Sequence, residues 1–300
     1  FFSSSIWCLI LYFFSFLLSD GFLYLSLSLR SNRRPSLRIP FLKRLIKRKL
    51  TNKQRIHDSV HRFTNTTANS EFLSKYYKFY RNLNIEKQKE FCVRVNTFIE
   101  SKKFEGRKDF EVTDEVKLII AAVAVHLTFG FRNYLLDRFS TIIIYPDEYF
   151  NEQTQNYHKG ETNAYGAIVF SWKDFVFGLT YDSDNLNLGF HEFGHAIFMS
   201  EKSYFLNPGF VFHYGRWQKL SQNADLKKRI SENKLFRRYA NQNEHEFFAV
   251  AIENFFETPA AFKESLPELY ETLSNMLNQD PLKPSILISE YDEYEVIGED

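Results

Sequence analysis

The sequence predicts an α+β protein in which helices predominate. Segments whose apolar residues recur at helical spacing are numerous, whereas only two segments are rich in β-branched residues. One helix start is clear at Thr113, because this N-cap threonine is followed by Asp114 and Glu115 in the first turn. Since helices outnumber strands, the chain falls in the α+β class.

The predicted elements follow one another along the chain after a polar linker. The helical segments are 71–83, 85–104, 113–131, 187–199, 217–230, 243–257 and 260–279. The two β-like segments are 140–150, whose β-branched run stops at Pro146, and 167–179, which mixes β-branched and aromatic residues. His126 lies in the apolar run of its helix, which favours a core histidine bonded to backbone.

Composition excludes several functional classes. The chain of 300 residues is long enough for a sizeable core, and its net charge of +1 gives no field that would favour nucleic acid as a partner. Cys8 and Cys92 are far apart and form no C-x-x-C, which excludes a disulfide scaffold and a cysteine zinc site. Any metal must therefore be held by histidine and carboxylate side chains.

The N-terminal region divides into an apolar and a basic part. Residues 1–19 carry no charge, Asp20 interrupts, and the apolar character continues to Leu29. Nine basic residues with no acidic one follow between Arg30 and Lys49. This order is typical of a membrane anchor with a basic cytoplasmic flank, and a signal peptide fits it less well. A second interpretation stays open, in which residues 1–29 are a spurious extension. We expect four parts: residues 1–29, a basic juxtamembrane segment and linker at 30–70, the folded domain at 71–285, and an acidic tail at 286–300.

The stretch "NLGFHEFGHAIFM", residues 187–199, carries the chemistry. In a helix, His191 and His195 lie one turn apart on the same face, so both imidazoles can bind one zinc ion. Glu192 is rotated by about 100° and lies beside the metal, where it can take a proton from a water molecule that zinc activates. Gly194 costs the helix about 1 kcal/mol against alanine, which makes sense if another backbone packs closely there.

A catalytic zinc site needs a third protein ligand. No third histidine follows at the spacing H-E-x-x-H-x-x-G-x-x-H, so we expect a carboxylate from a later helix. Segment 243–257 offers four candidates, which spacing alone does not separate: Glu244, Glu246, Glu253 and Glu257.

Several separated segments in order resemble the Mlc titration factor A family of zinc-dependent peptidases, in particular its membrane-associated bacterial members. The resemblance covers residues 71–285 and includes "VTDEVKLIIAAVAVHLTFGF", "IIIYPDEY", "IVFSWKDF", "HEFGHAI", "YANQNEHEFFAVAIENFFETP" and "LPELYETLSNMLNQDP". It implies a zincin-like fold of the gluzincin type, one zinc ion per chain, peptide or protein substrates, and a cytoplasmic catalytic domain. That domain would be anchored to the inner membrane by residues 1–29, or soluble if that segment is spurious.

The same resemblance implies the roles of individual residues. The zinc ligands would be His191, His195 and Glu246, and Glu192 would be the general acid and base. Tyr239, seven residues before the glutamate ligand, would stabilise the oxyanion. Glu253 would then orient a ligand histidine or bond to backbone, and His245 would point away from the metal.

Two other functions stay open. The family's name-giving member binds a transcriptional repressor, so the chain could instead be a regulatory protein on a peptidase fold that sequesters such a partner. A helical, membrane-tethered interaction domain without metal is the third hypothesis. The segment after His195, "AIFMSEKSYFLNPGF", departs from the family pattern, which leaves the substrate preference open.

Overall fold

A computed structural model describes residues 66–180, 184–204, 207–232, 236 and 243–283, all within one compact unit that spans Gln54–Asp300. The segment 1–29, the tail 286–300 and most of the linker predicted at 30–70 lie outside the described residues. Within the described part, no helix is long and apolar enough to cross a membrane.

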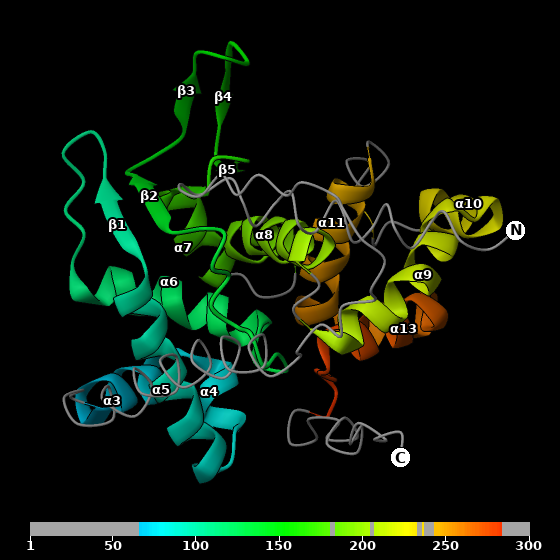
Figure 1. Cartoon of the computed structure of the whole chain (residues 1–300), viewed down its shortest axis with the longest axis horizontal. Coiled ribbons are helices and arrows are strands. Elements are labelled where there is room, and N and C mark those ends of the chain that lie inside the picture. The colour runs from blue at the N-terminus through cyan, green and yellow to red at the C-terminus, as the bar shows by residue number, and fades with distance from the viewer. Residues whose placement is uncertain (1–65, 181–183, 205–206, 233–235, 237–242, 284–300) are drawn as a thin grey trace, which may run out of the picture. The chain divides into compact units, whose positions relative to one another are not determined.

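Helices make up most of the described fold, as predicted (Figure 1). They are α3 (Thr66–Tyr76), α4 (Lys78–Asn82), α5 (Ile85–Ser101), α6 (Asp114–Leu127), α7 (Trp172–Thr180), α8 (Leu188–Tyr204), α9 (Pro208–Gln222), α10 (Ala224–Glu232), α11 (Glu244–Glu257), α12 (Pro259–Ser265) and α13 (Pro267–Leu277). The strands are β1 (Lys103–Gly106), β2 (Thr141–Tyr145), β3 (Tyr149–Asn151), β4 (Asn156–His158), β5 (Gly160–Thr162) and β6 (Ala167–Ser171). The α+β class is confirmed.

A small mixed sheet has the strand order β1-β2-β6-β5. Strands β1, β2 and β6 are parallel, and Ile142 of β2 pairs with Ile168 of β6. Strand β5 is antiparallel to β6 and forms the edge of the sheet, while β3 and β4 form a separate hairpin just before it. The sequence indicated β2 and β6 but gave no sign of β1, the hairpin or β5, because these strands are only three or four residues long.

The prediction of one β-like segment over 167–179 is wrong in its second half. The strand ends at Ser171 and helix α7 begins at Trp172. The backbone N–H of Asp174 donates to Ser171 Oγ at 3.3 Å, and the Ser171 hydroxyl donates to Asp174 Oδ2 at 2.6 Å. This capping arrangement satisfies the first turn and outweighs the β propensity of the aromatic residues that follow.

The segment predicted as one helix over 217–230 is also divided. Helix α9 ends at Gln222, and Asn223 caps α10 by accepting a hydrogen bond from Leu226 N at 2.8 Å. Similarly, the helical segment 260–279 divides into α12 and α13 at Pro267, which cannot continue the hydrogen bonding of a helix.

Helix α8 packs against α6 and α11 in the core of the unit, and Figure 1 shows it crossing α11. The crossing is close at Gly194, where a Cβ atom would lie 3.3 Å from Ala249 Cα. The expectation of a second backbone near Gly194 is therefore confirmed. Because α11 passes here, its first turn is held over the middle of α8.

His126 is buried in the core, as predicted, but its partner differs. The ring nitrogen Nδ1 forms a hydrogen bond with the hydroxyl of Tyr77 at 3.1 Å, whereas the sequence predicted a bond to a backbone group. Burial lowers the pKa of His126 to about 3, so the ring is uncharged at neutral pH.

Candidate metal centre

Asn187 fixes the start of helix α8. Its Oδ1 accepts from Phe190 N at 3.0 Å, and its backbone carbonyl accepts from His191 N at 2.9 Å. Its side-chain NH2 donates in turn to Gly178 O and to Glu257 Oε1, both at 3.0 Å. The helix that carries the two motif histidines is thus tied to α7 and α11 through its N-cap residue.

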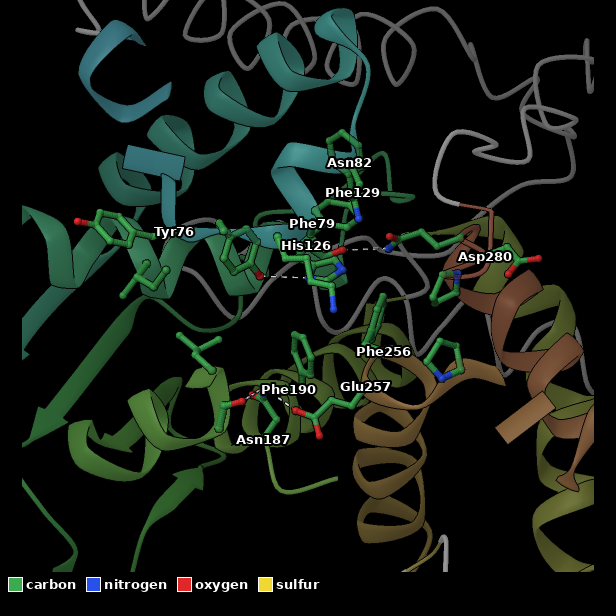
Figure 2. Close-up of a pocket in the computed structure, with 18 residues that line it drawn as sticks. Tyr76, Phe79, Asn82, His126, Phe129, Asn187, Phe190, Phe256, Glu257 and Asp280 are labelled. Atoms are coloured by element: carbon green, nitrogen blue, oxygen red, sulfur yellow. Dashed lines mark hydrogen bonds between the residues drawn. The ribbon is translucent and has the colours of Figure 1, made fainter. Parts of the chain in front are cut away.

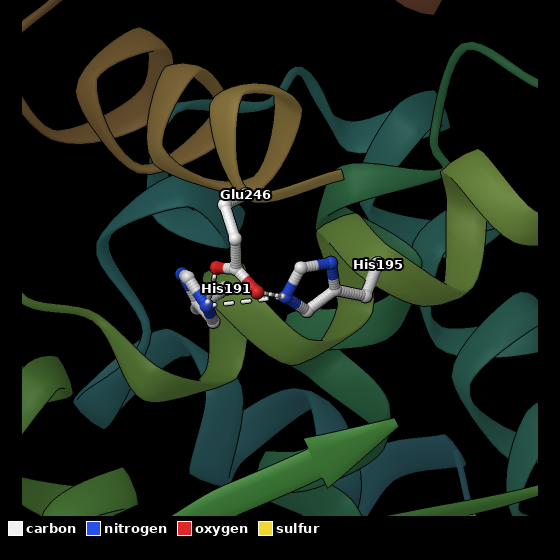
Figure 3. A group of neighbouring side chains, drawn as sticks. All are labelled: His191, His195 and Glu246. Atoms are coloured by element: carbon white, nitrogen blue, oxygen red, sulfur yellow. Dashed lines mark hydrogen bonds and ion pairs between the residues drawn. The ribbon is translucent and has the colours of Figure 1, made fainter. Parts of the chain in front are cut away.

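Three side chains converge between α8 and α11 (Figure 3). His191 Nε2 and His195 Nε2 lie 3.2 Å apart. Glu246 Oε2 lies 3.3 Å from His191 Nε2, and Glu246 Oε1 lies 3.5 Å from His195 Nε2. The structure thus brings Glu246 to the two histidines and leaves Glu244 and Glu257 elsewhere.

The convergence fits a metal ion. A tetrahedral zinc site with bonds of about 2.0–2.1 Å has ligand–ligand edges of roughly 3.3–3.4 Å. The distance between the two Nε2 atoms, and the distance from each of them to the nearer Glu246 oxygen, are close to this value. Glu246 Oε2 is also buried and accepts no hydrogen bond from the described residues. A buried carboxylate oxygen without a donor is costly, and a cation between these side chains would satisfy it. Two imidazole nitrogens and one carboxylate oxygen are donors that zinc accepts.

Local structure positions Glu246 for this contact. It lies in the first turn of α11, and its backbone N–H donates to the N-cap side chain of Asn243 at 3.0 Å. Its side chain is only 15% exposed, similar to the 14% and 13% of His191 and His195. The three groups therefore meet in a largely desolvated space in which charges interact strongly.

Glu253 holds His191 from the other side. Its Oε1 lies 2.6 Å from His191 Nδ1, and its Oε2 accepts from the backbone N–H of Asn187 at 3.1 Å. Both roles considered for Glu253 in the sequence are therefore present in one side chain. A carboxylate on Nδ1 orients the ring and leaves Nε2 facing the other two side chains.

The carboxylates dominate the protonation of this cluster. Burial disfavours a charged His191, but Glu246 and Glu253 outweigh it and raise the pKa of His191 to about 10. Burial likewise opposes ionisation of Glu246, but the two histidines lower its pKa to about 2. The cluster therefore favours positive charge between the carboxylates, which a proton or a metal ion can supply.

Glu192 is buried beside the cluster, against the edge strand β5. Thr162 Oγ1 lies 2.9 Å from both Glu192 Oε2 and Glu192 O. A Cβ atom on Gly160 would lie 2.6 Å from Glu192 Oε1, so a larger residue there would have to displace the Glu192 side chain. Burial raises the pKa of Glu192, and His191, His195 and Thr162 oppose the rise. A carboxyl with a raised pKa is suited to exchange protons near neutral pH.

Several other residues singled out in the sequence lie outside this centre. Glu244 accepts a hydrogen bond from the Tyr214 hydroxyl at 3.0 Å, and the His245 ring packs edge-on against Phe198. Tyr239, the predicted oxyanion residue, lies outside the described residues.

Sequence reasoning missed Asn187 and Thr162. An asparagine before an apolar helix is a recognisable N-cap signal, whereas nothing local connects Thr162 with a glutamate thirty positions later.

A helical α+β chain with this donor set and a buried glutamate beside it is a metallopeptidase-type protein. It belongs to the family of glucose-regulated metallo-peptidases M90, whose model matches residues 48–277. This membership implies a metal ion and confirms the family indicated by the sequence.

Relatives agree with this membership. An uncharacterized protein of Synechocystis sp. is 29% identical over 222 residues, which cover 68% of this chain and 81% of the relative. Mlc titration factor A of Edwardsiella ictaluri is 24% identical over 226 residues, which cover 67% of this chain and 84% of the relative. Mlc titration factor A of an Escherichia coli strain is 22% identical over 220 residues, 67% and 82% of the two chains.

Proposed function

We propose that this chain is a zinc-dependent peptidase with a zincin-like fold in residues 71–285, and that it hydrolyses peptide bonds at the His191, His195 and Glu246 centre. The observation that carries the proposal is that these three side chains meet closely enough to bind one metal ion, with buried Glu192 beside them. Family membership supports the reaction class.

The chain's own residues have distinct tasks in this proposal. His191, His195 and Glu246 hold zinc, and Glu253 keeps His191 in the orientation that exposes Nε2. When bound, zinc supplies Lewis acidity, which polarises the peptide carbonyl and lowers the pKa of water towards about 7. Glu192 takes the proton from the attacking water and delivers it to the leaving amine. Thr162 keeps the Glu192 carboxylate in place between these two transfers.

Strand β5 offers a docking position for an extended peptide. It is the edge of the sheet, and no other described strand pairs with its outer side. Gly160 and Thr162, two residues apart, both approach Glu192 from this strand. A substrate that adds to the edge by main-chain hydrogen bonds would run past Glu192 without requiring particular side chains.

Tyr239 completes the proposal as the donor to the oxyanion, on the basis of its position seven residues before Glu246. Tyr239→Phe should lower turnover and leave zinc content nearly unchanged. If this variant lost its zinc instead, Tyr239 would have a structural role at the metal and the assignment would be wrong.

The central experiment measures zinc content and hydrolysis together. The full chain, Glu192→Gln and the control Glu244→Gln are purified, zinc per chain is quantified, and each protein is assayed on a mixed peptide library. We expect one zinc in all three proteins and cleavage in the parent and the control only. His195→Ala and Glu246→Ala should lose zinc. Cleavage that survives in Glu192→Gln would refute the mechanism.

The relatives named Mlc titration factor A support a second candidate function, the binding of a regulatory protein. Zinc in both the parent and Glu192→Gln, with cleavage in neither, would favour that function. Absence of zinc from every protein would contradict the metal centre itself.

A further inference from the structure

A cavity lies beside the start of α8, and its lining contains neither the three converging side chains nor Glu192. It has a volume of about 340 Å³ and is lined by residues of α4, α6, α7, α8, α11 and the segment that follows α13 (Figure 2). Small-molecule sites in proteins begin at about 300 Å³, so the cavity is large enough for a small organic ligand.

Aromatic rings form one part of the cavity wall. The ring of Phe79 stacks on His126 with centroids 3.7 Å apart, and Phe256 meets His126 edge-on at 4.8 Å. Phe190 of α8 lies beside Phe256, at 5.4 Å between centroids. His126 is uncharged at neutral pH, so this wall is aromatic and carries no charge. Such a wall suits an apolar or aromatic group and also attracts cations through the rings.

The polar end of the cavity contains a carboxylate that can accept a further hydrogen bond. Glu257 Oε1 accepts from Asn187 Nδ2 at 3.0 Å, whereas Glu257 Oε2 is buried and has no hydrogen-bond partner among the described residues. Asp280 contributes a second acidic side chain to the lining. The basic side chain among the described lining residues, Lys78, belongs to an exposed position on α4. No described side chain therefore supplies a hydrogen-bond donor or a positive charge to Glu257 Oε2.

We propose that this cavity binds a small organic cation, with its apolar or aromatic body against Phe79, Phe190 and Phe256 and its ammonium group on Glu257 Oε2. An ammonium group supplies both the missing donor and the missing charge, and charge-assisted hydrogen bonds of this kind are among the strong ones. A neutral ligand would supply only the donor, and an anion would be repelled by Asp280 and by the ionised form of Glu257.

Occupancy of the cavity is linked to the metal centre through Asn187. The side chain of Asn187 donates to Glu257 Oε1, its backbone N–H donates to Glu253 Oε2, and Glu253 Oε1 lies 2.6 Å from His191 Nδ1. A ligand that binds Glu257 therefore acts on Asn187. This residue caps α8 and also donates a hydrogen bond to Glu253, the carboxylate that orients His191. This linkage rests on the proposed metal site, whereas binding of the cation does not.

Binding is tested with a defined probe on the full chain. Calorimetric and NMR titrations use 2-phenylethylamine as the cation, 2-phenylethanol as its neutral counterpart and 3-phenylpropionate as an anion. We expect the amine to bind at least tenfold more tightly than the other two, and Glu257→Gln to weaken amine binding by about tenfold or more. The matched control Glu268→Gln, an exposed glutamate on α13, should bind as the parent does.

A second variant separates loss of the site from loss of the fold. Leu179→Trp places a large side chain at the cavity wall and should abolish amine binding while the circular dichroism spectrum stays that of the parent. Equal binding of the amine to the parent, Glu257→Gln and Leu179→Trp would overturn the site. Equal binding of the amine and the alcohol to the parent would overturn the cation as the ligand class.

The linkage is read from zinc affinity and not from hydrolysis. Zinc competition with a chelator, repeated with and without saturating 2-phenylethylamine, should show a shift of about threefold or more in the parent and none in Glu257→Gln. Amine binding without any shift in zinc affinity would overturn the linkage. Because amine binding is measured directly, a protein that bound the amine but did not hydrolyse peptides would contradict the proposed function and leave this site standing.

Discussion

His191 and Glu253 are joined by a contact of 2.6 Å between Nδ1 and Oε1, across the interface of α8 and α11. Glu253 is 1% exposed, so this contact is screened from water. It joins the histidine of one helix to the carboxylate of another, two turns beyond Glu246 on α11. Helix α11 therefore contacts His191 twice, once on each ring nitrogen.

We predict that Glu253→Gln weakens zinc binding by about 10–100-fold without abolishing it, because the amide still reaches Nδ1 but no longer supports the ring with a charge. His191→Ala should lose far more affinity. Zinc competition with a chelator measures both. The control Glu264→Gln, an exposed glutamate on α12, should match the parent. If Glu253→Gln bound zinc as tightly as the parent, Glu253 would contribute to the packing of the two helices and not to zinc binding.

Thr162 gives a prediction about the pH dependence of hydrolysis. Burial raises the pKa of Glu192, and the Thr162 hydroxyl opposes this rise because it favours the ionised carboxylate. Thr162→Val should therefore raise the pKa of Glu192 further. A base must be deprotonated to act, and the acidic limb of the kcat/KM profile should therefore move to higher pH by about one unit. Thr162→Ser keeps the hydroxyl and should keep the parent profile. An unshifted limb in Thr162→Val would mean that another group controls it.

Gly194 predicts a coupling between stability and zinc binding. A leucine side chain there would push against Ala249 and Ile252 of α11, and overpacking of this kind costs about 1–3 kcal/mol. Because α11 also carries Glu246, we expect Gly194→Leu to lower both the melting temperature and zinc affinity. The matched control is Gly215→Leu on α9, where a Cβ atom meets nothing within 4 Å. Parent-like zinc affinity in a destabilised Gly194→Leu would show that the helices can separate without moving Glu246.

Local sequence signals predicted the helices that carry the site. Apolar periodicity and the N-cap at Thr113 identified α6, and the same spacing located α8 and α11. Strand signals were weaker, since β-branched and aromatic residues are common to β6 and to α7. The capping pair Ser171 and Asp174, only three positions apart, is the local feature that separates β6 from α7 in the structure.

Without the family resemblance, the candidate site was predictable only as far as one helix extends. His191, Glu192 and His195 follow from helical spacing, because the three lie within two turns. The choice of Glu246 among four glutamates depends on where α11 crosses α8, which spacing along α11 does not encode. Thr162 reaches Glu192 from an edge strand of three residues, a tertiary contact with no counterpart in the local pattern.

Glu257 predicts how stability depends on pH. Burial, with smaller contributions from nearby Glu253 and Asp184, raises the pKa of Glu257 from its usual 4.5 to about 7. A carboxyl whose pKa is higher in the folded state favours folding while it is protonated. This contribution is complete below about pH 4.5 and is lost as pH rises through about 7. The shift corresponds to roughly 3 kcal/mol at most, and solvent screening at this half-buried side chain reduces it to about 1–2 kcal/mol.

Glu257→Gln cannot ionise, so its free energy of unfolding should equal that of the parent near pH 4 and exceed it by about 1–2 kcal/mol near pH 8.5. The amide oxygen of glutamine can still accept the hydrogen bond that Asn187 donates at 3.0 Å in the parent. The difference in stability between the two proteins therefore does not include the loss of this bond. Urea titrations of both proteins between these pH values measure the difference, and exposed Glu268→Gln should run parallel to the parent. If the curves of parent and Glu257→Gln were also parallel, Glu257 would ionise as freely in the folded protein as in the unfolded chain, and the desolvated carboxylate that the cavity presents to a cation would not exist.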